Sequence, residues 1–130
     1  MLRYALVPGA GIVDAVREGH RLNLPAARLT GARPVRPLVT VEDDRVVVAA
    51  VKLAEDRSGD VVVRLHECLG GRAEATLAPD FPVASVHAVD LLERPREEDA
   101  GAFTALPDGT VALRLRPFQI LTLRLSRHRG

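Results

Sequence analysis

The stretch that decides the fold is Val46-Val-Val-Ala-Ala-Val-Lys-Leu53, followed closely by Val61-Val-Val-Arg-Leu-His-Glu67. Both runs are rich in β-branched residues and have the length of strands. Between them, Asp56-Arg-Ser-Gly-Asp60 is polar and carries a glycine that suits a positive backbone φ. The two runs therefore predict an antiparallel hairpin.

Shorter strand signals continue toward the C-terminus and are separated by turn signals. The extended runs are 73–77, 84–91, 110–116 and 120–125, and the turns are Gly70-Gly71, the charged loop 95–101 and Pro107-Asp108-Gly109. In the last two runs apolar and polar residues alternate, which is typical of strands with one buried face. This succession predicts an all-β fold, an antiparallel two-sheet β-sandwich with an N-terminal appended segment.

A sandwich buries the apolar positions that face the space between its sheets. We expect the inward set to include Val47, Val51, Val63, Leu65, Leu77, Val111, Leu113, Leu115, Leu121 and Leu123.

The first part of the chain has a different character, because residues 1–37 hold four of the nine prolines and show little alternation. We therefore divide the chain into an N-terminal segment, 1–37, and a C-terminal β-sandwich domain, 38–130. Residues 3–8 look like a strand left over from a preceding β-domain. Residues 12–20 fit a short helix weakly, and a loop fits them equally well.

Composition excludes several classes of function. Hydrophobic residues make up 47% and charged residues 27% of the 130, which describes an ordinary globular domain. The net charge of +1, with both signs interspersed, argues against a nucleic-acid partner. No apolar run approaches the roughly 20 residues of a membrane helix. The only cysteine is Cys68, and the apolar run at 4–7 is broken by Pro8-Gly9, so we expect a cytoplasmic protein without disulfides.

Several motifs together resemble the α-mannosidases of glycoside hydrolase family 38. Residues 46–56 resemble "VVVSALKKAED", residues 63–67 resemble "LRLYE", and residues 116–123 resemble "PFEIKTL" or "PFQVLSL". Leu91-Leu-Glu93 stands where that family has an "LLE" strand end. Tyr4-Ala-Leu-Val-Pro8 resembles "YALMPH" and Leu22-Asn-Leu-Pro25 resembles "LNFP", although Gly9 replaces the histidine of the family pattern.

The resemblance implies a C-terminal β-sandwich domain of a metal-dependent, retaining α-mannosidase. It implies that the aspartate nucleophile and a divalent metal, zinc or similar, lie in a separate N-terminal catalytic domain, which would be the partner of this chain. No catalytic or metal-binding motif of the family falls within residues 1–130, so we assign this chain no catalytic, cofactor-binding or metal-binding residue.

The residues themselves offer few candidates for a separate site. The acidic clusters 42–44, 55–56 and 97–99 fall in predicted turns, where carboxylates cap backbone amides. Glu67 and Glu93 each end an apolar run, and we interpret them as satisfied carboxylates at the rim of the sandwich. His66 and Cys68 have the spacing of two metal ligands, but a structural zinc site requires four.

Two alternative functions remain open at this point. The first is a free-standing carbohydrate-binding module, although the chain has no Trp, and we expect Phe81, Phe103 and Phe118 to be used in the core. The second is a protein-interaction module. We also expect weak self-association, as a homodimer formed through residues 1–30 or the surface that a missing neighbour would cover.

Overall fold

The structure is a computed structural model that describes residues 4–24, 26–28, 30–31 and 33–127. It divides into two compact units, Met1–Arg36 and Pro37–Gly130.

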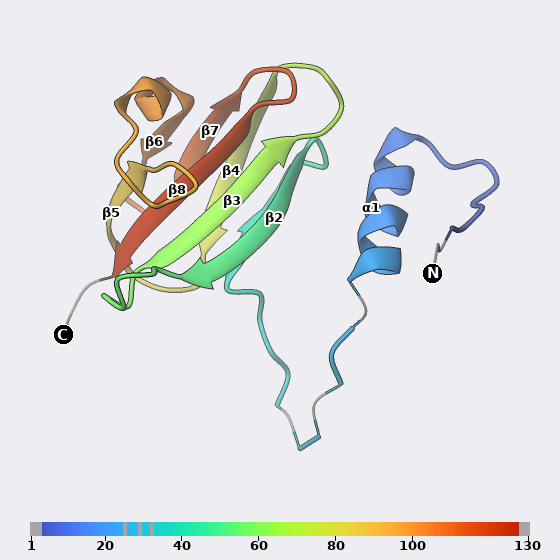
Figure 1. Ribbon diagram of the computed structural model, residues 1–130, viewed down its shortest axis with the longest axis horizontal. Coiled ribbons are helices and arrows are strands. Elements are labelled where there is room, and N and C mark those ends of the chain that lie inside the picture. Colours follow the sequence, from blue (N-terminus) through green and yellow to red (C-terminus); the bar gives the residue numbers. More distant parts are fainter. Residues whose placement is uncertain (1–3, 25, 29, 32, 128–130) are drawn as a thin grey trace. The chain divides into compact units, whose positions relative to one another are not determined.

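Residues 37–127 form a β-sandwich of two four-stranded antiparallel sheets (Figure 1), which confirms the predicted fold class. One sheet has the order β1-β4-β7-β6 and the other the order β2-β3-β8-β5. The strands are β1 (Val39–Val41), β2 (Val46–Leu53), β3 (Val61–Glu67), β4 (Ala73–Pro79), β5 (Val83–Ala88), β6 (Phe103–Ala105), β7 (Val111–Leu115) and β8 (Ile120–Arg127).

The core lies between the sheets and consists mainly of leucine and valine from β3, β4, β7 and β8. Strict alternation on these central strands directs every second side chain inward. The inward positions that the structure confirms as buried are Val63, Leu65, Leu77, Val111, Leu113, Leu115, Leu121 and Leu123.

Strand β2 departs from the prediction because its alternation is interrupted. The register to β3 shifts between Val48 and Ala50, which is a β-bulge. The extra residue reverses the faces, so Val47 pairs with His66 on the outer face and the expectation that Val47 points inward is wrong. Val51 does share a face with its buried partner Val63, yet Val51 is 39% exposed. The three-residue strand β1, at the edge of the opposite sheet, is too short to cover all of β2.

The segment after β5 lies over β8 on the outer face of its sheet (Figure 1). The Val89 N–H donates to the Thr122 carbonyl at 2.9 Å, and Thr122, on the outer face of β8, is buried. Strand β5 ends at Ala88, so residues 91–93 form a turn and not the strand end that the family pattern suggested. The charged loop predicted at 95–101 overlaps the 3-10 helix η1 (Glu97–Ala102).

In the unit Met1–Arg36 the main element is the helix α1 (Ile12–Asn23). Its first turn is stabilised by the Asp14 carboxylate, which accepts the Gly11 N–H at 3.0 Å. Of the two alternatives for this region, the helix is the one observed. The strand predicted over 3–8 is absent from residues 4–8, and Arg3 lies outside the described residues.

Candidate functional site

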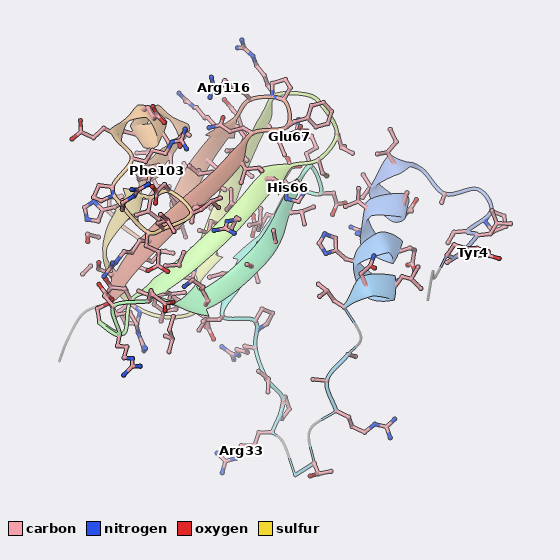
Figure 2. The ribbon with its side chains drawn as sticks, in the orientation of Figure 1. Tyr4, Arg33, His66, Glu67, Phe103 and Arg116 are labelled. Carbon is pink, nitrogen blue, oxygen red and sulfur yellow. The ribbon has the colours of Figure 1, made fainter. Side chains whose placement is uncertain are left out.

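Glu67 occupies the best-defined polar site of the sandwich. It ends β3 at the end of the sandwich where the β3–β4 and β7–β8 loops meet (Figure 2), and it is 1% exposed. Its carboxylate accepts four backbone N–H groups. The donors are Leu69 (2.8 Å), Gly70 (2.8 Å), Gly71 (3.3 Å) and Phe118 (2.9 Å). One side chain therefore joins two loops that are about fifty residues apart in sequence.

The loops around Glu67 are shaped so that their N–H groups converge on it. Gly70 has φ +78°, a left-handed conformation that glycine adopts without strain. The Phe118 ring lies against it, since a Cβ at position 70 would be 2.7 Å from Phe118 Cζ. Phe118 itself has φ +56°, which for an aromatic residue is unfavourable and must be held by the surroundings. Its N–H bond to Glu67 supplies one such restraint.

The hydrogen bonds decide the charge state of Glu67. Burial alone raises the pKa of a carboxyl, because it disfavours the ionised form. Here the N–H groups of Phe118, Leu69, Gly70 and Gly71 outweigh burial, and the pKa of Glu67 is lowered. Glu67 is thus a fixed carboxylate that is saturated by its own backbone, as expected for a satisfied carboxylate, although it is more buried than a rim position suggested.

Glu93 forms a second anchored carboxylate, on the outer face of the other end of the same sheet. Its carboxylate accepts the Glu55 N–H at 2.8 Å and forms an ion pair with Lys52 Nζ at 2.5 Å. The Lys52 ammonium is the main reason that the pKa of Glu93 is lowered. Because Glu93 has φ +62°, it ends a tight turn whose geometry these two contacts hold.

Arg124 on β8 organises the turn of the β2–β3 hairpin. Its guanidinium donates to Asp60 Oδ2 at 2.8 Å and to Asp56 Oδ2 at 2.6 Å. It also donates to Ser58 Oγ at 3.0 Å, while Ser126 Oγ donates to Asp60. Hydrogen bonds from Ser58 and from Arg124 lower the pKa of Asp56. Sequence reasoning missed this cluster, since its members lie more than sixty residues apart.

Glu67 and Glu93 lie too far apart to act on one substrate bond. Lys52, which holds Glu93, pairs with Val62 near the start of β3, while Glu67 ends that strand. Five residues at about 3.3 Å each separate these positions by roughly 16 Å along the strand. A retaining glycosidase needs its two carboxyl groups about 5 Å apart.

The predicted acidic clusters also serve the turns that contain them. Asp43 binds the Arg45 guanidinium at 2.6 Å, and that hydrogen bond lowers the pKa of Asp43. Asp99 binds Arg96 Nε at 3.0 Å. Wherever the pKa of a described carboxyl departs from its ordinary value, the shift is downward. These groups are Asp43, Asp56, Asp60, Glu67, Asp90, Glu93 and Asp108.

The described residues offer no assembled metal site and no buried polar side chain left without a hydrogen-bond partner. Among them, no three His, Cys, Asp or Glu side chains are grouped closely enough to hold a metal ion. Cys68 lies just beyond β3, and its Sγ is 3.6 Å from the Asp44 carbonyl oxygen. Burial raises the pKa of its thiol. Within the same residues, every buried side-chain nitrogen or oxygen has a hydrogen-bond partner.

The three phenylalanines divide differently from the prediction. Phe81 and Phe103 are half-buried and pack against the core. Phe118 is 70% exposed, so the expectation that the core uses all three is wrong. Its left-handed backbone and its N–H bond to Glu67 direct its ring over Gly70.

The fold and these contacts define a β-sandwich domain in which the anchored carboxylates hold the molecule's own loops and turns. The sequence profile described as "Glycosyl hydrolases family 38 C-terminal beta sandwich domain" matches residues 45–123. The chain belongs to this family, and the resemblance seen in the sequence is confirmed.

The chain is also similar to an alpha-mannosidase of Saccharomyces cerevisiae. The two are 27% identical over 153 aligned residues, which cover 95% of this chain and 14% of the yeast protein. The chain therefore spans a small part of the length of the curated relative that it matches. In the residues that the structure describes, no helix is long and apolar enough to cross a membrane.

Proposed function

We propose that this chain is a non-catalytic C-terminal accessory domain of an α-mannosidase-like glycoside hydrolase. In this proposal it packs on the catalytic domain and helps to shape the cleft in which mannosides bind. The observation that carries the proposal is the use of the carboxylates: Glu67, Glu93 and the Asp56–Asp60 turn are all engaged in holding strands and loops together.

The chemistry of glycoside hydrolysis supports this assignment. A retaining enzyme needs a general acid whose pKa is raised, facing a second, ionised carboxylate. In the described residues, every carboxyl pKa that departs from its ordinary value is lowered and not raised. Glu67 also has its lone pairs occupied by four N–H groups. The proposal accordingly assigns the nucleophile and a divalent metal, zinc or similar, to the catalytic domain of a cytoplasmic parent enzyme.

The isolated chain is expected to hydrolyse no α-mannoside. Purified chain would be incubated with an activated aryl α-mannoside and added zinc or another divalent metal, and release of the aryl group measured. The yeast α-mannosidase in the same assay serves as the positive control. Metal-dependent turnover that stays with the chain through repurification would overturn the proposal.

The accessory role is tested by exchange of the homologous segment. In the yeast α-mannosidase, the segment that matches this chain would be deleted, or replaced by this chain. We expect the deletion to lower soluble yield and turnover at least tenfold, because it exposes a surface that was buried, and the replacement to restore much of both. A deleted enzyme with unchanged yield and turnover would contradict an accessory role.

Sugar binding is the second candidate, and one observation favours it. Phe118 presents an exposed ring on a restrained loop, beside the exposed Arg116, and aromatic faces are common contacts for sugars. A single ring offers little area, so we expect mannose and mannobiose to bind no more tightly than about 1 mM, or ~4 kcal/mol. Calorimetric titration that gave a micromolar Kd, lost in Phe118→Ala, would favour this role over packing.

A further inference from the structure

The outer face of the β2-β3-β8-β5 sheet carries an exposed apolar patch. It consists of Leu91 and Leu92, which are 71% and 72% exposed, and of Ile120 on β8, which is 63% exposed. Leu91 and Ile120 line one hollow of about 200 Å³, whose other lining residues are Val89, Thr122 and the charged residues Asp90, Arg96 and Asp99. Isolated exposed apolar side chains are ordinary, but Leu91 and Ile120 share one hollow and Leu92 follows Leu91 directly, and such a cluster is typical of an interaction site.

The two leucines are held outward by an ordered turn. The Asp90 carboxylate accepts the N–H groups of Leu92 (2.8 Å) and Arg94 (2.9 Å) and binds Arg94 Nε at 2.8 Å. On the other side of the leucines, the Glu93 N–H donates to the Asp90 carbonyl at 3.1 Å. The turn is thus held by hydrogen bonds within the chain itself and does not need a partner to form.

Glu93, the last residue of this turn, binds residues at the opposite edge of the sheet. Glu93 follows β5 at one edge, yet its carboxylate binds Lys52 and the Glu55 N–H at the end of β2, the opposite edge. Its left-handed φ of +62° is the strained feature that the anchor stabilises. Such preorganisation reduces the entropy lost on binding, so the leucines are suited to fill a pocket on a partner.

Charged residues around the patch are paired with one another. Arg94 binds Asp90, and Arg96 binds Glu98 and Asp99. A partner therefore needs no strong charge here; it needs an apolar contact inside a polar rim, as in interfaces between domains. A sugar would require free polar groups beside the apolar ones, and this rim offers mainly groups that are already paired.

We propose that this patch, Leu91, Leu92 and Ile120, is the surface through which the sandwich packs on the remainder of its parent enzyme. The inference rests on the proposed accessory role. The polypeptide that covers the patch is inferred from chain length. The matched segment is only 14% of the yeast relative, so most of that polypeptide lies outside it. An apolar surface of that remaining polypeptide covers the two leucines.

The test uses the yeast α-mannosidase in which this chain replaces the matched segment. The double variant Leu91→Ser/Leu92→Ser is compared with a control double variant, Leu38→Ser/Leu53→Ser, at two other exposed leucines. We expect the patch variant to shorten the half-life of activity at a fixed elevated temperature at least tenfold. The control should change it less than threefold.

Folding of the variants is checked on the isolated chain, where both pairs are exposed and the melting temperature should stay within about 2 °C. If the patch variant is destabilised there, Ile120→Thr, which keeps a β-branched residue in the strand, replaces it in the exchanged enzyme.

Each result decides one way. If the exchanged enzyme is stable and the patch variant matches it, the surface assignment is wrong while the accessory role stands. An equal loss in the control also overturns the assignment. An exchanged enzyme no better than the deleted one overturns both ideas. Sedimentation of the isolated chain showing a dimer that Leu91→Ser/Leu92→Ser abolishes would identify a second copy as the occupant instead.

Discussion

Replacing Glu67 with alanine is expected to lower the melting temperature of the chain by more than about 10 °C. The carboxylate is 1% exposed and receives N–H groups from Leu69, Gly70, Gly71 and Phe118. Without it four partly buried N–H donors lose one shared acceptor, and a cavity is left where the buried carboxylate was, which together cost far more than the loss of a single exposed hydrogen bond. The left-handed backbone at Phe118 also loses a restraint. Thermal unfolding followed by circular dichroism measures the effect.

Two further variants separate the charge of Glu67 from its shape. Glu67→Gln keeps one accepting oxygen and turns an NH2 group toward N–H donors, so we expect roughly half the loss. Glu74→Ala removes a carboxylate whose side chain is 80% exposed and whose contact with Arg114 is 3.6 Å, so it should change the melting temperature by no more than about 2 °C. A Glu67→Ala protein that melts within 2 °C of wild type would contradict the role given to Glu67.

The lowered pKa of Glu67 also predicts how the stability of the chain depends on pH. Because the folded pKa of Glu67 is lowered, the unfolded chain binds its proton more tightly and stability rises with pH in this range. The contribution is present above the ordinary carboxyl pKa of 4.5 and is lost as pH falls through the lower folded value. The difference in melting temperature between wild type and Glu67→Gln should therefore shrink as the pH is lowered below 4.5. A difference that grows in acid would reverse the sign of the shift.

The sequence predicted the sandwich because its central strands follow the simplest rule of β structure. In β7 and β8 the alternation of leucine or valine with polar residues marks the buried face, and in β3 the run of valines marks a central strand, without help from the rest of the chain. The family resemblance, carried mainly by residues 46–56, 63–67 and 116–123, pointed to the same fold.

What the sequence could not predict depends on contacts between distant residues. A bulge near Ala50 reverses the faces of β2, and nothing in an unbroken apolar run marks it. The Arg124 cluster joins β8 to a turn more than sixty residues earlier. Leu91 and Leu92 resembled a strand end, but Asp90 and Glu93 fold them into a turn. The sequence indicated only part of the site at Glu67. A glycine pair after an acidic strand end suggests a turn, but it does not suggest the fourth N–H donor, from Phe118.

Contacts between distant residues also decide how deeply each leucine is buried, and this leads to a second large expected effect. It is seen when two leucines on one face of the sheet are compared. Leu65 pairs with Val48 and Leu53 pairs with Val61, and these pairs face the opposite sheet. Leu65 is fully buried, whereas Leu53 is 65% exposed because the short strand β1 leaves that end of β2 uncovered. Leu65→Ala should lower the free energy of unfolding by about 2–5 kcal/mol, since it leaves a cavity. Leu53→Ala should lower it by no more than about 0.5 kcal/mol.

Urea unfolding of the full chain measures both values, provided that the slope of the transition is unchanged between variants. Equal losses would mean that the end of β2 is covered in solution, either by another part of the chain or by a second copy. Dilution distinguishes these two cases: cover by a second copy weakens as the protein concentration falls, and cover from within the chain does not. A small loss at Leu65 would instead mean that the two sheets pack loosely around β3, contrary to the close core of leucine and valine seen between them.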